Sequence, residues 1–252
     1  MKENLSLPGR RPWRLVVLAL AICIGMSGAA FAQEETPSST SYEIWPETDL
    51  WLRLSPAWRL SMFVPLTQNI ETKYREGNLI LQADYGWGRT KSLIKRRMLD
   101  EDRAREMKIF LARGGYNHGQ SLDDKGASYL ENMLFFEFHV RNPLKGRILL
   151  SHRFRADFRW LGEDRTFSTR YRYRLMVEKE FLWGRASIVP YVNVEPFYDS
   201  RYDYVNRVRY IGGATVAWTS YFAIETNLTY QHDSKSSVTN LYALNVILHI
   251  FF

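Results

Sequence analysis

The chain has 252 residues, of which 46% are hydrophobic and 15% aromatic, and its mean hydropathy is −0.32. This composition excludes a bundle of membrane helices, each of which would need about 20 consecutive, mainly apolar residues. The formal net charge of +7 is compatible with a nucleic-acid-binding protein. The arginines, however, alternate with carboxylates on strand-like segments and form no basic tail or helix, so nucleic acid is not an expected partner.

Residues 1–32 have the three-part pattern of a secretory signal peptide. Four basic residues precede an uninterrupted apolar run at 15–24, and small residues lead to Ala30-Phe31-Ala32. The run is too short for a membrane anchor, and the Ala-x-Ala sequence predicts cleavage before Gln33. Cleavage would remove Cys23, the single cysteine, and with it disulfide or thiolate chemistry. We expect the polar residues 33–41 to form a flexible lead-in in the periplasm.

Residues 42–252 show the alternation of a β-barrel, most clearly in the last strand, Tyr242–Phe252. Every second side chain of this segment is apolar or aromatic, while Asn245 and His249 occupy the opposite face. A half-apolar strand of about ten residues is the unit of a transmembrane β-barrel. The edge strand of a soluble sandwich is the alternative. The final Phe252 resembles the C-terminal assembly signal of bacterial outer-membrane barrels, which implies the barrel-assembly machinery as a partner.

Further strand-like runs follow one another along the chain, bounded by turn residues. They cover Asp49–Leu54, Trp58–Leu66, Gly77–Trp87, Met107–Tyr116, Tyr129–Arg141, Gly146–Leu161, Thr169–Phe181, Ala186–Tyr198, Val205–Thr219, Tyr221–Gln231 and the last strand. Together they make about eleven segments. Because bacterial single-chain barrels have an even number of strands, we predict an all-β, antiparallel transmembrane barrel of ten or twelve strands. Both of its ends should then lie in the periplasm.

The connections between the strands also carry predictions. Short turns are expected in the periplasm at 142–145, 183–185 and 219–220, and extracellular loops at 161–168, 199–204 and 233–238. Two interfacial girdles are predicted from aromatic residues near strand ends, namely Trp58, Trp87, Trp160, Trp183, Trp218, Tyr221 and Tyr230. Residues 89–106 break the alternation and predict a solvated, charged helical excursion. A basic helix on anionic lipid head groups is the alternative for this segment.

From about residue 44 to the end, the order of motifs resembles a family of bacterial outer-membrane barrels, domain of unknown function 2490. The motifs are Leu150–Arg155 with Arg159, Arg170–Leu175, Glu195–Phe197, Asn206-Arg207 and Ile211–Gly213. The resemblance implies a barrel in the bacterial outer membrane. It implies no activity, cofactor or catalytic residue.

An inward ladder of arginines is the most specific feature of the predicted barrel. It consists of Arg153, Arg155, Arg159, Arg170, Arg172, Arg174, Arg207 and Arg209, and the same interior holds Glu131, Glu137, Asp157, Glu178, Glu180, Glu195 and Glu225. Fixed guanidinium groups in a narrow lumen would attract anions. Alternatively, the arginines and carboxylates pair with one another and fill the interior, since buried charges need partners.

A second candidate site is His232 with Ser234, at the end of the penultimate strand. A His-x-Ser pair there resembles the motif of outer-membrane lipid hydrolases, in which histidine activates a serine nucleophile. Lys235 stands where those families have asparagine, and Asn240 is the best available residue to orient His232. A chance loop pair is the alternative. The sequence has no phosphate-binding glycine loop, metal-spaced His/Cys cluster or Gly-x-Ser-x-Gly motif, so no cofactor or metal is expected.

The sequence therefore favours a small, non-enzymatic barrel in the outer membrane, with lipid around it. The functional hypothesis is a pore for small anionic solutes through an arginine-lined lumen. Two alternatives stay open, a surface lipid hydrolase using Ser234 and His232, and a plugged structural or binding barrel.

Overall fold

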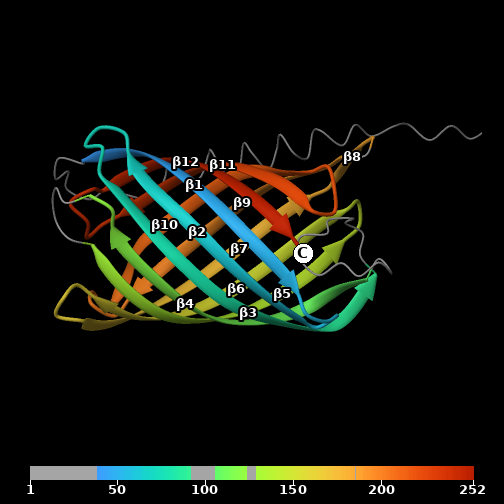
Figure 1. Ribbon diagram of the computed structural model, residues 1–252, viewed down its shortest axis with the longest axis horizontal. Helices are drawn as coiled ribbons and strands as arrows, with labels where there is room; N and C mark the ends of the chain where they lie inside the picture. The colour runs from blue at the N-terminus through green and yellow to red at the C-terminus, as the bar shows by residue number, and fades with distance from the viewer. Residues whose placement is uncertain (1–38, 92–105, 124–128, 185) are drawn as a thin grey trace, which may run out of the picture. The chain divides into compact units, whose positions relative to one another are not determined.

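The computed structural model describes residues 39–91, 106–123, 129–184 and 186–252, and these residues form strands joined by turns and loops (Figure 1). The strands are β1 (Thr40–Arg53), β2 (Trp58–Asn69), β3 (Arg75–Lys91), β4 (Glu106–Ser121), β5 (Leu130–Leu144), β6 (Ile148–Leu161), β7 (Thr166–Lys179), β8 (Phe181–Trp183), β9 (Ala186–Asp199), β10 (Tyr204–Ala217), β11 (Phe222–Asp233) and β12 (Asn240–Phe251). The predicted all-β barrel is confirmed.

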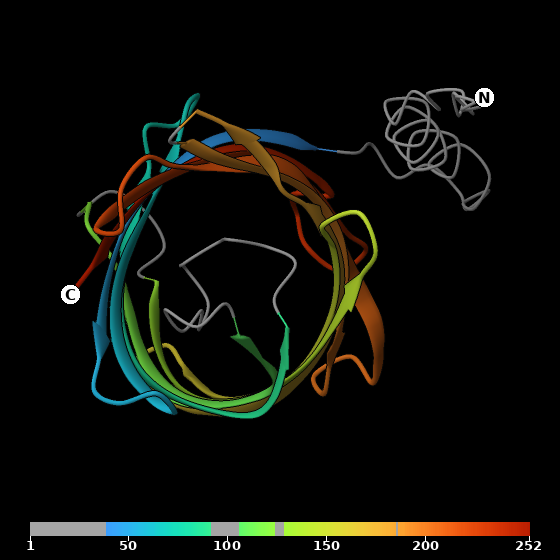
Figure 2. The ribbon, with the colours of Figure 1, turned by 90° about the vertical axis from the view of Figure 1, so that its right-hand side faces the viewer.

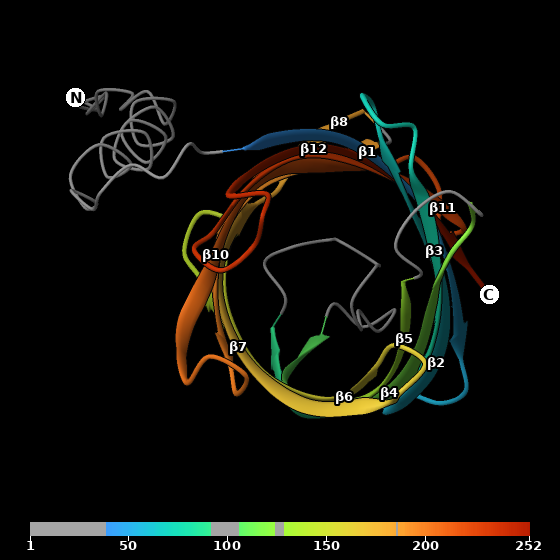
Figure 3. The same cartoon turned by 90° about the vertical axis from the view of Figure 1, so that its left-hand side faces the viewer.

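The strands form one sheet that closes on itself, as the views along the barrel show (Figures 2 and 3). Strands that are neighbours in the sequence pair in antiparallel fashion, and β1 pairs with β12 in parallel. The short β8 continues the line of β7 beyond Glu180 and pairs with β9 in the same register as β7. The sheet thus has twelve strands, and eleven of them close the ring.

The parallel pair of β1 and β12 follows from the odd number of strands in the ring. Thr40 lies opposite Asn240, and Trp51 lies opposite Phe251. The two ends of the barrel chain are therefore at opposite rims, and the prediction that both lie on the same side is wrong. That prediction assumed that an even number of strands would close the ring.

The connections separate into two sets, as predicted. The predicted turns at 142–145, 183–184 and 219–220 lie at the rim that contains Phe251, which we call the turn rim, whereas residue 185 of the second turn lies outside the described residues. The loops that follow β6, β9 and β11 lie at the other rim, which contains Thr40 and which we call the loop rim. The β5–β6 turn is centred on Gly146, whose positive φ of 81° suits glycine.

Most strand boundaries differ from the sequence predictions by one to five residues, and two segments differ more substantially. Strand β1 begins at Thr40, nine residues before the predicted run, because Tyr42 and Ile44 continue the outward apolar positions. Residues 89–91 and 106 belong to β3 and β4, although they were assigned to the charged excursion. The rest of that excursion, 92–105, lies outside the described residues, as does the signal peptide.

Burial is inverted relative to a soluble domain. Among the described residues, thirty buried side chains are polar or charged and only eleven are hydrophobic. The outward positions carry the large apolar side chains, such as Leu228 at 68% exposure and Phe136 at 60%. Since side chains alternate across a strand, the polar face of each strand lines the interior and the apolar face covers the outside.

Aromatic side chains form a row around the loop rim across four neighbouring strands. The ring centroids are 6.2 Å apart for Tyr210 and Tyr230, 5.1 Å for Tyr230 and Tyr242, and 5.6 Å for Tyr242 and Tyr42. At the turn rim, Trp183, Trp218 and Tyr221 of the predicted girdle are exposed. The row crosses the parallel pair, so stacking of Tyr42 on Tyr242 helps to fix its register.

The closure of the ring can be tested by cysteine cross-linking in a chain whose Cys23 is replaced by serine. We expect Tyr42→Cys and Tyr242→Cys to form a disulfide, because directly paired residues have the Cα separation of about 4.4–6.8 Å that a disulfide requires. The measurement is the mobility of the oxidised and reduced protein on a gel.

Tyr42→Cys with Val246→Cys is the matched control, since the four-residue offset separates these positions by roughly 13 Å along the strand. Equal cross-linking of both pairs would contradict the parallel register.

Candidate functional site

Glu137 of β5 is the centre of the charged network inside the barrel. Its carboxylate accepts hydrogen bonds from Arg155 at 2.8 Å and Arg113 at 3.1 Å. His139 lies at 2.9 Å and Arg153 at 3.5 Å from the same group. The Glu137 side chain is only 1% exposed, so this buried negative charge depends on its neighbours for stabilisation.

The register of β6 against β7 explains why the network needs so many carboxylates. Arg153 lies directly opposite Arg174, and Arg155 lies directly opposite Arg172. Like charges that face each other across a sheet destabilise it. The two strands are stable together because acidic side chains lie between the guanidinium groups.

Glu195 and Asp157 separate the facing arginines. Glu195 of β9 accepts a hydrogen bond from Arg172 at 2.8 Å and is also paired with Arg153. Asp157 is paired with Arg155, and it lies 3.8 Å from Arg172. Each carboxylate therefore joins guanidinium groups from different positions, as a charge-assisted network requires.

A buried aromatic ring packs against several of the arginines. Phe197, which is 1% exposed, has the guanidinium carbons of Arg172 at 4.5 Å and Arg209 at 5.2 Å from its ring centroid. Arg207 and Arg170 lie at 5.7 and 5.9 Å from the same ring. Such cation–π contacts stabilise cations that are removed from water. Phe197 belongs to the Glu195–Phe197 motif of the family resemblance, but the sequence predicts no site role for it.

At the loop rim, the network continues through Asp199. This carboxylate lies 3.4 Å from Arg159, 3.6 Å from Arg170 and 2.8 Å from Arg201. The hydrogen bond to Asp199 raises the pKa of Arg201, which lies in the loop after β9. Arg159 is paired with Glu131 as well.

Two further contacts complete this end of the network. Arg207 is 2.6 Å from Asp233. Tyr129 donates a hydrogen bond of 2.6 Å to Glu131, and burial, together with this neighbouring carboxylate, raises the pKa of the phenol. Tyr129 is therefore protonated and serves as a donor.

Arg174 and Arg209 differ from the other inward arginines. In the described part of the chain, neither has a carboxylate oxygen within 4.0 Å. Arg209 donates hydrogen bonds of 2.7 and 3.1 Å to the neutral side chain of Gln231. Arg174 borders an interior cavity. These two cations keep more of their charge available for a solute than the paired arginines do.

The interior opposite the arginines is acidic. His249 of β12 lies 3.1 Å from Asp49 of β1 and 3.5 Å from Glu225 of β11. Glu225 also accepts a hydrogen bond of 3.0 Å from Thr215. Strands β1, β11 and β12 lie across the ring from β6 and β7, so the interior is polarised from one wall to the other.

A cavity of about 270 Å³ lies between these walls. Its lining includes Arg113, Arg141, Arg153 and Arg174 on one side and Asp49, Glu225 and His249 on the other, with Trp51, Asn193, Asn227 and Asn245. The cavity thus contacts both charged walls.

The structure brings most of the predicted site residues together. Six of the eight predicted arginines and Glu131, Glu137, Asp157 and Glu195 form the network, whereas Arg174 and Arg209 lack a carboxylate partner in the described part of the chain. Glu225 belongs to the acidic wall, and Glu178 and Glu180 are buried near the turn rim. Members that the sequence analysis missed are Arg59, Asp84, Arg113, His139, Asp49, Asp199 and Asp233. Strict strand parity would have placed these side chains in the interior.

His232 and Ser234 have other partners. Nδ1 of His232 lies 3.2 Å from Oδ1 of Asn240, the residue expected to orient it. The Ser234 hydroxyl donates to the main-chain carbonyl of Asn206 at 3.2 Å and lies 3.3 Å from the Tyr204 hydroxyl. The serine is thus held by β10 residues.

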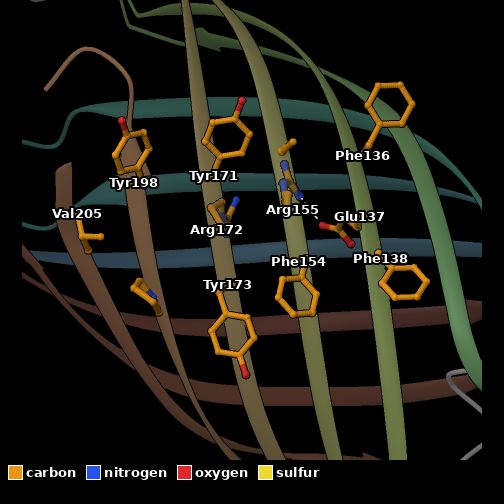
Figure 4. Close-up of a pocket in the computed structure, with 12 residues that line it drawn as sticks. Phe136, Glu137, Phe138, Phe154, Arg155, Tyr171, Arg172, Tyr173, Tyr198 and Val205 are labelled. Carbon is orange, nitrogen blue, oxygen red and sulfur yellow. Dashed lines mark hydrogen bonds and ion pairs between the residues drawn. The ribbon is translucent and has the colours of Figure 1, made fainter. Parts of the chain in front are cut away.

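The outward face of the arginine strands is aromatic. Figure 4 shows the rings of Phe154, Tyr171 and Phe136 on these strands and the contact between Arg155 and Glu137. A shallow hollow of about 530 Å³ lies over Ala156, between these rings. Adjacent positions therefore present an aromatic surface outside and a charged network inside.

Within the described ranges, no group of three or more His, Cys, Asp or Glu side chains is arranged to hold a metal ion. The same residues include no helix with the length and apolarity needed to cross a membrane.

Fold and interior together define a closed β-barrel with a charged interior. The family model "Protein of unknown function (DUF2490)" matches residues 107–242, which is more than half of the chain. The chain belongs to this family, and the matched residues include the motifs on which the resemblance rests. Neither the curated proteins nor the solved structures contain a significant match.

Glu137→Gln tests whether the network stabilises the barrel. Removing this charge leaves three arginines and a histidine without their shared anion, and breaking a buried pair costs about 3–5 kcal/mol. We expect a loss of that size in the free energy of unfolding, measured by urea titration of the refolded protein in detergent.

Glu71→Gln, in the exposed loop after β2, is the matched control and should leave the unfolding free energy unchanged. Equal stability of both variants would show that Glu137 is dispensable.

Proposed function

We propose that this chain is a bacterial outer-membrane barrel whose arginine-lined lumen admits small solutes with an anionic group. The observation that carries the proposal is the pair of inward arginines, Arg174 and Arg209, that have no carboxylate partner in the described part of the chain. Fixed guanidinium groups of this kind favour anions in a confined aqueous space.

The inverted burial supports the membrane location. A membrane barrel places apolar side chains against lipid and polar side chains in its lumen, with aromatic girdles at both interfaces. The girdle residues Tyr221, which directly precedes β11, and Tyr230, within β11, are nine positions apart. At a tilt of about 40° they are separated by about 23 Å along the barrel axis, close to the roughly 25 Å height of an apolar band.

The number of strands supports an interior wide enough for a solute. Eleven strands close the ring, and strands about 4.8 Å apart with a tilt of about 40° then give a diameter of about 22 Å between opposite backbones. The cavity at Arg174 is part of that interior.

The paired arginines have a different role in this proposal. Arg153, Arg155 and Arg172 stabilise the wall through Glu137, Asp157 and Glu195. Their charges are largely compensated, so they shape the passage. In the cell envelope, the barrel-assembly machinery would recognise the last strand, β12. The turn rim would face the periplasm.

The test is single-channel conductance of the refolded protein in a planar bilayer under a potassium chloride gradient. We expect a reversal potential that favours chloride. In the double variant Arg174→Gln with Arg209→Gln, the ratio of chloride to potassium permeability should fall severalfold, because the two uncompensated cations are lost.

Lys179→Gln provides the matched control, because Lys179 is on the outward face of the strand that carries Arg174. This variant should keep the selectivity of the original protein. A folded barrel that never conducts would instead favour a plugged structural barrel.

A further inference from the structure

The cavity beside Arg174 is lined by groups of opposite charge. Arg113, Arg141, Arg153 and Arg174 come from β4 to β7, whereas Asp49 and Glu225 come from β1 and β11. These strands face each other across the ring. The field inside the cavity therefore runs across the barrel, from the arginine wall to the acidic wall.

Several buried polar atoms on the cavity wall make no hydrogen bond to the described residues. They are Oδ1 of Asp49, Nε1 of Trp51, Oδ1 of Asn193 and Oδ1 of Asn245. All four side chains are less than 9% exposed, and all four border the cavity. Buried polar groups require partners, so this wall is built to receive polar atoms of a solute or water.

Three of these four atoms are acceptors, and two of them, on Asp49 and Asn245, accompany the acidic wall. Asp49 and Asn245 belong to β1 and β12, and an ammonium group, which offers three donors and no acceptor, matches carboxylate and amide oxygens. The opposite wall offers the guanidinium group of Arg174, which matches a carboxylate or sulfonate.

We propose that the cavity binds a small zwitterionic solute, with its anionic group on Arg174 and its ammonium group on Asp49 and Glu225. This inference rests on the proposed passage of solutes and names their class. A single binding site can hold both groups, because Arg174, Asp49 and Glu225 all border the same cavity.

The size of the cavity sets the size of the solute. A volume of about 270 Å³ equals the share of roughly nine water molecules in liquid water. An amino acid or an aminosulfonate fits this space. An anion of the same size would be attracted only by the arginine wall and would be repelled by the acidic wall.

The experiment is tracer uptake into proteoliposomes that contain the refolded protein, with three small probes. Taurine carries a sulfonate and an ammonium group, isethionate replaces that ammonium by a hydroxyl group, and choline carries only the positive charge. We expect taurine to enter faster than isethionate, and choline to enter slowest.

Asp49→Asn and Glu225→Gln should each reduce taurine uptake about fivefold relative to isethionate, because each removes one attractive charge. Arg174→Gln should slow both taurine and isethionate. Lys179→Gln, on the outward face, should change neither. A difference in gel mobility between heated and unheated samples confirms that each variant is folded. If Asp49→Asn fails to fold, Glu225→Gln provides the same test.

Two outcomes would overturn the inference in distinguishable ways. If isethionate enters as fast as taurine and the acidic variants change nothing, the zwitterion site is wrong and the anion route stands. If a folded barrel admits none of the three probes, both the zwitterion site and the proposed function are wrong.

Discussion

The structure depends on the compensation of arginines that face one another across neighbouring strands. Arg153 opposite Arg174 and Arg155 opposite Arg172 would repel each other if β6 and β7 were alone. Carboxylates from β5, β6 and β9 lie between them. The charges therefore act as cross-strand connections, and they specify which strands must be neighbours and in which register.

Much of this arrangement can be read from the sequence, because alternation is a local property. The alternation of side chains along each strand places Arg153, Asp157 and Glu195 in the barrel interior, and this does not depend on which strands are the neighbours. Ring closure is different, because it joins Thr40 to Asn240, and no turn connects these segments. The sequence pattern gives eleven strand-like runs, with residues 169–181 as one of them, and eleven strands close the ring. The direction of the closing pair is mispredicted because bacterial single-chain barrels generally have an even number of strands.

The ion-pair partner of each charged side chain likewise cannot be predicted from the alternation within its own strand. Asp49 meets His249 only because β1 and β12 are adjacent, and the sequence separates these residues by almost the whole barrel. Phe197 and Trp51 are apolar residues on polar faces, so alternation alone gives no reason for them. Phe197 packs against the guanidinium group of Arg172, and Trp51 packs against that of Arg59. Each of these cation–π contacts joins two neighbouring strands, so only the folded barrel explains the position of the ring.

The parallel pair of β1 and β12 has a consequence for how the barrel is made. All other pairs join segments that are neighbours in the chain, so they can zip together as hairpins, whereas this pair must bring together residues about 200 positions apart. Loop closure over such a distance costs entropy before any contact repays it, and parallel pairing is slightly weaker per residue. The pair is therefore the last to form and the first to separate, so an open sheet with β1 and β12 as its two free edges is the natural precursor of the closed barrel.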